Sequence, residues 1–200
     1  MLWRAMLVAA SLALGGCAGL YFKDAGPAPA VGYTLETLPY FSYWTGIVFN
    51  GEKVGFSHFE VRKEASSPRY EIRSEATIVL RFLGLEKTIL LRSRDLVNAD
   101  LTLVELDYWF RVDDSELQVA GSRQGEELVA RITTAGTTTA QRLAAPGKLY
   151  PSSVINLYPA LHGLEVGREH RYLVYHGQTQ SLADRRAQRL AEHGLASWRV

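Results

Sequence analysis

Apolar and polar side chains alternate along most of the chain from about residue 44 onward. Over residues 69–82 one face carries the apolar side chains of Tyr70, Ile72, Ala76, Ile78, Leu80 and Phe82. The other face is charged or polar, with Val79 as its one apolar residue, and residues 101–112 repeat the pattern. An alternation of period two is typical of a β-strand with one solvated face, because a helix would scatter these residues around its circumference.

Turn-forming residues separate the alternating segments. Asn50-Gly51 is a strong hairpin signal because both residue types tolerate a positive φ. The pattern predicts strands near residues 43–50, 53–64, 69–82, 86–98, 101–112, 116–123, 127–134 and 137–144. Long strands joined by short turns form an antiparallel meander. We therefore expect a mainly β fold: a single strongly curved antiparallel meander, either a half-barrel or an open barrel.

Two segments depart from the strand pattern. Residues 151–163 begin with Ser152-Ser153, which can cap a helix, and end at Gly163, which predicts a short helical plug in the mouth of the sheet. A further strand is expected at 170–176, followed by a C-terminal helix at 181–194. Periodicity cannot separate a solid core from a hollow one, so an apolar cavity for a ligand stays open as an alternative.

The first 17 residues have the order of a secretory signal. Arg4 precedes an apolar run at residues 5–14, and Gly15-Gly16 leads to Cys17, the single cysteine of the chain. An ordinary signal peptide and a short transmembrane helix are the alternatives, although the run is about half of the roughly 20 residues that a membrane-spanning helix needs.

Residues 14–17, Leu-Gly-Gly-Cys, also resemble the signal of bacterial lipoproteins. The resemblance implies a diacylglycerol on the Cys17 thiol, cleavage before Cys17 and acylation of the new amino group. Ala18, where a retained lipoprotein would carry aspartate, resembles the class sorted to the outer membrane. The expected location is therefore the periplasmic face of that membrane, held by a lipid anchor.

The chain divides into four expected parts: a signal peptide at 1–16, a lipidated N-terminus and flexible tether at 17–40, the β domain at 41–178 and a helical tail at 179–200. Without Arg4 the remainder carries 21 basic and 21 acidic residues, from totals of 22 and 21. A formal charge of zero gives no attraction for nucleic acid. The expected partners are the membrane, through the anchor, and an envelope protein or an apolar ligand.

Candidate chemistry is sparse. The five histidines lack metal-ligand spacing, and the only cysteine is assigned to lipid. Asp113-Asp114 is better explained as a turn than as a catalytic carboxylate pair, because neighbours on a strand point to opposite faces. His58 is expected in the core or at the rim. We predict no catalytic residue, no metal and no cofactor, and hence no enzyme.

Aromatic residues are the strongest candidates for an interaction surface. Tyr43 and Trp44 lie at the start of the first predicted strand, and Trp109 falls on the face opposite Tyr108 and Phe110. Trp109 is therefore either exposed to a partner or covered by the N-terminal segment or the terminal helix.

Three stretches carry a family resemblance: residues 43–56, 81–84 (Arg-Phe-Leu-Gly) and 149–153 (Leu-Tyr-Pro-Ser-Ser). Together they resemble the β-rich N-terminal region that precedes a transglutaminase-like catalytic domain in bacterial envelope proteins. The resemblance implies an accessory module, and no residue here matches the catalytic Cys-His-Asp of that superfamily. A looser resemblance of architecture links the chain to periplasmic lipoprotein carriers and receptors. The predicted function is a non-catalytic, partner-binding or accessory lipoprotein, with the accessory half of such an enzyme or a lipid-binding protein as alternatives.

Overall fold

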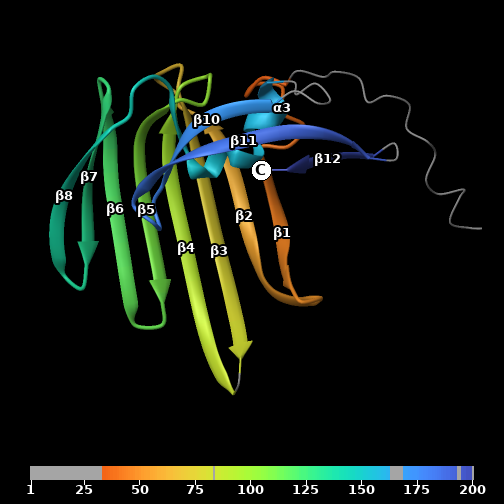
Figure 1. Cartoon of the computed structure of the whole chain (residues 1–200), viewed down its shortest axis with the longest axis vertical. Coiled ribbons are helices and arrows are strands. Elements are labelled where there is room, and N and C mark those ends of the chain that lie inside the picture. Colours follow the sequence, from red (N-terminus) through yellow and green to blue (C-terminus); the bar gives the residue numbers. More distant parts are fainter. Residues whose placement is uncertain (1–32, 83, 163–168, 193–194, 200) are drawn as a thin grey trace, which may run out of the picture.

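A computed structural model describes residues 33–82, 84–162, 169–192 and 195–199. Eight strands form one antiparallel sheet in chain order (Figure 1). They are β1 (Ser42–Phe49), β2 (Glu52–Lys63), β3 (Tyr70–Phe82), β4 (Leu85–Val97), β5 (Leu103–Val112), β6 (Ser115–Gln124), β7 (Glu127–Thr134) and β8 (Thr137–Ala144). The predicted antiparallel meander is confirmed, and the sheet does not close into a barrel, because β1 and β8 are its two edges.

A second sheet of four strands was not predicted. Its order is β12 (Leu195–Arg199), β11 (Ser181–Glu192), β10 (Glu169–His176) and β9 (Leu149–Pro151), with β9 and β10 parallel. The prediction of a C-terminal helix is wrong, since residues 181–192 pair antiparallel with β10 from Ser181 to Gln188. Pairing with a neighbouring strand here outweighs the weak local preference for helix.

The predicted helical plug is also wrong in form. Residues 152–162 make a 3-10 turn, η1 (Ser152–Asn156), and a separate five-residue helix, α3 (Tyr158–His162). Pro151 stands where a capping residue was expected, and its side chain cannot hydrogen-bond to the first turn. Without a barrel there is no mouth to plug. The 3-10 turn η1 instead contacts β3, β9 and β10, and Tyr158 of α3 stacks on Tyr172 of β10.

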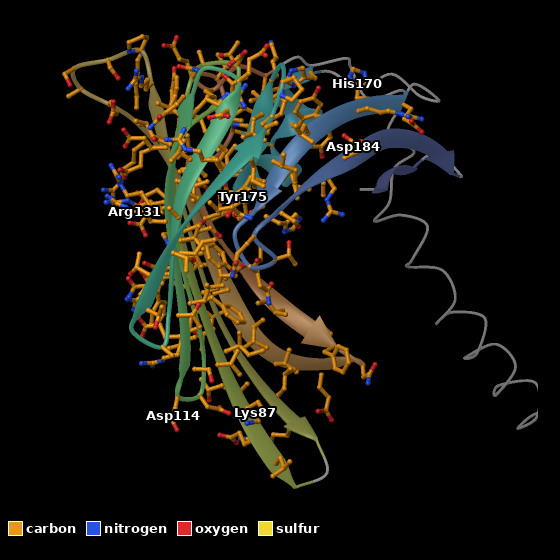
Figure 2. All side chains as sticks on the ribbon, turned by 60° about the vertical axis from the view of Figure 1, so that its left-hand side comes forward. Lys87, Asp114, Arg131, His170, Tyr175 and Asp184 are labelled. Atoms are coloured by element: carbon orange, nitrogen blue, oxygen red, sulfur yellow. The ribbon has the colours of Figure 1, made fainter. Side chains whose placement is uncertain are left out.

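The second sheet lies over the upper part of one face of the large sheet, which we call the inner face (Figures 1 and 2). Figure 2 shows Tyr175 between the two sheets and Arg131 on the opposite, outer face. Gly177 marks the closest approach of the layers: a Cβ built there would lie 2.6 Å from Cγ of Tyr108. A glycine is needed at this point because any side chain would push the sheets apart.

The core lies between these layers. Ile72, Val97 and Leu101 of the large sheet and its loops are fully buried, as are Val154 and Val174 from the covering elements. Leu35 and Leu38 also belong to this cluster, at 2% and 8% exposure. The folded body therefore begins before residue 41, inside the segment that was expected to be tether.

None of the helices in the described ranges is long and apolar enough to cross a bilayer. The same ranges contain no group of three or more histidine, cysteine, aspartate or glutamate residues arranged to hold a metal ion.

Candidate functional site

The inner face of the large sheet changes character halfway along its strands. Its upper half is buried beneath the second sheet, whereas its lower half carries apolar side chains that stay half-buried. These side chains, which we call the lower inner face, are Ile78, Leu80, Ile89, Leu91, Phe110, Val112 and Leu117.

Strand register places these residues in adjacent rows. Leu91 lies opposite Phe110, which lies opposite Leu117, and Ile78 is aligned with Ile89 and then Val112 one row below. The apolar area spans four strands in one direction and about four residues along each strand in the other. It therefore measures about 14 Å on each side. Figure 2 shows the sheet curving toward the side of the second sheet, so this area lies on the concave side.

On β2, β3 and β4 small residues lie between the lower inner face and the buried core, whereas Leu91, Phe110 and Leu117 pack directly against that core. Ser57, Ser74, Ala76 and Ser93 lie on the same face of β2, β3 and β4 and are all partly accessible. Thr45 on β1 continues this band, and its hydroxyl group lies 2.6 Å from that of Ser57. The band leaves space above the sheet and offers hydroxyl groups as hydrogen-bonding partners.

A single charged pair marks the far end of this face. Lys87, next to Leu80 in the register, makes an ion pair with Asp113 in the β5–β6 turn. The hydrogen bond from Lys87 lowers the pKa of the Asp113 carboxyl group, and the backbone N–H of Thr88 adds to this effect. Both charges are thereby satisfied at the edge, and the seven residues of the lower inner face are themselves uncharged.

A carboxyl group is buried in the upper half of the inner face. Asp95 is 5% exposed and lies between Ile72 and Leu106 in the register. Burial raises the pKa of Asp95 to about 7, opposed by the nearby Ser153 hydroxyl. That hydroxyl is itself buried without a well-formed hydrogen bond, so the contact is too poorly aligned to compensate for burial. Asp95 is enclosed by the core and does not reach the lower inner face.

The outer face is lined with charges. The Glu71 carboxylate is contacted by Arg73 at 2.5 Å and by Arg94. Burial alone would raise the pKa of Glu71, but the two guanidinium groups outweigh it and hold the pKa below its usual range. Arg73 and Arg94 also line a shallow depression beside Trp109.

Trp109 is half-buried and lies on this outer face, opposite Arg92 in the register, so the second sheet, which lies over the inner face, does not cover it. Arg92 and Arg111 lie over its ring, with guanidinium carbons 5.2 and 5.4 Å from the ring centre. Cation–π contacts of this kind stabilise the stack and leave little of the indole free to contact a partner.

The three predicted interaction residues do not form one surface. Trp44 lies on the outer face of β1 with 63% of its surface exposed, stacked on His58 at 4.4 Å between ring centres. The register connects it through three intervening strands to Trp109, about 19 Å away. Tyr43 faces the other way and stacks on Phe59 at 5.1 Å, beside the core.

His58 also lies on the outer face, where its ring nitrogen is 2.8 Å from the Ser42 hydroxyl. It is therefore a rim residue rather than part of the core. Cys17, the predicted lipid attachment site, lies outside the described residues.

The residues of the lower inner face were visible in the sequence as the apolar half of the alternation, but the alternation alone could not show that they stay only half-buried. Comparison of the chain with protein-family models, curated proteins and solved structures found no match.

Proposed function

We propose that this protein is a lipid-anchored lipoprotein of the bacterial cell envelope whose non-catalytic β domain binds an acyl chain on the lower inner face. The observation that carries the proposal is an uncharged, half-buried apolar area on the concave side of the sheet. Ligand-binding sites on proteins are typically concave and lined mostly by apolar side chains.

The chemistry of the surface favours an acyl chain over a peptide. The backbone groups of β3, β4 and β5 are already paired with neighbouring strands, so the face presents side chains alone. A peptide laid on it would leave its own N–H and C=O groups without partners, which costs free energy. An acyl chain has no such groups, and each methylene fully removed from water contributes about 0.8 kcal/mol.

The hydroxyl band fits the polar end of such a ligand. Ser57, Ser74 and Ser93 border the apolar area, where they can donate hydrogen bonds to an ester or carboxyl oxygen. The proposed anchor at Cys17 would hold this surface close to a membrane, where acyl chains are available.

A matched pair of variants tests the binding surface. Ile78 and Val79 are adjacent on β3, both half-buried and β-branched, and they point to opposite faces. With a dansyl-labelled fatty acid as probe and palmitic acid as competitor, Ile78→Asn is expected to weaken binding by about 1 kcal/mol, roughly five-fold in Kd. Val79→Asn is expected to bind as the unmodified chain does.

Equal effects of the two variants, or a probe displaced by an apolar peptide and not by palmitic acid, would contradict the proposed ligand. The anchor is tested separately by the intact mass of protein extracted from bacterial membranes. We expect a chain beginning at Cys17 with acyl groups attached, and Cys17→Ser is expected to remove both the acyl mass and the membrane retention. An unacylated native protein would refute the anchor while leaving the binding surface untouched.

A further inference from the structure

The open edge at β1 is unusual in composition. Its sequence from Ser42 to Phe49 contains no charged residue and no proline. Proteins normally protect an exposed edge strand with lysine, proline or another charge, because unpaired backbone groups can recruit a further strand. Across the described part of the chain, β1 pairs with β2 alone, whereas β8 at the other edge carries Arg142 and several threonines.

Large apolar side chains are exposed along the same edge. Of the large hydrophobic residues that are exposed in the described chain, all but Leu85 lie between residues 40 and 56. Trp44 and Val48 are each 63% exposed, Phe49 is 60% exposed and Phe56 is 45% exposed. The rings of Trp44 and Phe56 lie 5.5 Å apart and Val48 shares their face, whereas Phe49 lies on the opposite face of the same edge.

Nothing within the described part of a single copy of the chain requires a glycine at position 46, in the middle of β1. Its backbone is outside the positive-φ region, and an added Cβ would meet only the flexible stem of Lys53, at 3.6 Å. A glycine inside a strand weakens it and often marks a place where another backbone or ligand approaches closely.

We propose that β1 pairs antiparallel with β1 of a second copy of this chain, with Gly46 on the two-fold axis, to form a dimer with a continuous sheet. In this register Trp44 lies opposite Val48 of the partner subunit, and Tyr43 lies opposite Phe49 of the partner subunit. Residues directly opposite must share a face of the sheet, and both pairs satisfy this condition. Aromatic and β-branched pairs of this kind stabilise neighbouring strands.

The size and charge of the edge suit a second copy. The exposed parts of Trp44, Val48, Phe49 and Phe56 amount to roughly 400 Å² per copy. Two copies would bury about twice this area before the paired backbone is counted, which approaches the lower end of specific interfaces, near about 1,200 Å². Because β1 is uncharged, self-pairing places no like charges opposite each other and buries no unpaired charge.

Disulfide crosslinking in the cell envelope tests the register. The Gly46→Cys variant of the full chain is expressed. The unmodified chain is run beside it, because any covalent dimer that it forms must come from Cys17. Opposed Cα atoms in an antiparallel pair lie about 4.5–5.5 Å apart, within the range of a disulfide. We expect Gly46→Cys to form a covalent dimer, and Thr45→Cys, which is offset by two residues from its own copy, to do so at least about five-fold less.

A second measurement does not depend on oxidation. Trp44→Lys places a charge in the proposed interface at an exposed position, so the fold should be retained, and Ala140→Lys is the matched change on β8. In detergent, light scattering is expected to give a dimer mass for the full chain and for Ala140→Lys, and a monomer mass for Trp44→Lys. A monomeric full chain, or stronger crosslinking of Thr45→Cys than of Gly46→Cys, would overturn the proposal. Neither result depends on what the lower inner face binds.

Discussion

The buried carboxyl group of Asp95 makes stability depend on pH in a predictable way. Burial raises the pKa of this carboxyl group from its ordinary value of 3.8 to about 7 in the folded chain. Between these values the folded state holds a proton that the unfolded state has released. The free energy of unfolding therefore falls as pH rises from about 4 to about 7 and then levels off, with a total loss of about 4 kcal/mol.

Asp95→Asn removes this titration while nearly preserving the shape of the side chain. Between pH 5 and pH 8 we expect the stability of the variant relative to the unmodified chain to rise by about 3 kcal/mol. The assay is urea unfolding of both proteins, followed by tryptophan fluorescence at several pH values. The change with pH is the diagnostic quantity, because the amide has its own burial cost at every pH.

Asp114→Asn serves as the control, since Asp114 lies exposed in the β5–β6 turn. Its effect on the free energy of unfolding should vary little over the same range. A stability difference for Asp95→Asn that stays constant from pH 5 to pH 8 would refute the reasoning. It would mean that the Asp95 carboxyl group is solvated or ionised in the folded chain.

Two further predictions concern the outer face and the contact between the sheets. Glu71→Gln should destabilise the chain at pH 7, because two guanidinium groups lose their carboxylate. Since the pKa of Glu71 is lowered, this deficit should start to shrink as pH falls below about 4.5 and vanish only below the lowered pKa; a pH-independent deficit would contradict the assignment. Gly177→Ala should lower the free energy of unfolding by about 1–3 kcal/mol in denaturant titrations, because the new methyl group meets the Tyr108 ring. An unchanged midpoint for Gly177→Ala would show that the sheets are not packed as described.

The strands of the large sheet could be predicted because each combines alternation with clear turn residues. Asn50 and Gly51 have φ values of 50° and 81°, as the hairpin signal required. All eight predicted strands agree with the structure to within two residues at each end, the largest difference being at the start of β5.

The prediction of a C-terminal helix was wrong for a physical reason. Residues 181–192 contain arginine, alanine and leucine, which favour a helix locally, but they find a pairing partner in β10. The two strands form a hairpin across residues 177–180, and pairing with a neighbouring strand is not encoded in the helix propensity of residues 181–192 alone. The site was predictable only in part: alternation placed Ile78 and Phe110 among the inward-facing apolar residues of their strands, while the extent of the second sheet decides that they remain only half-buried.

The claim that the concave lower half of the sheet is the binding surface is tested most directly by methyl NMR with a spin-labelled fatty acid. A paramagnetic acyl chain should broaden the methyl signals of Ile78, Ile89 and Leu91 more strongly than that of Val79 on the outer face. Broadening confined to the outer face, or none at saturating fatty acid, would contradict the account.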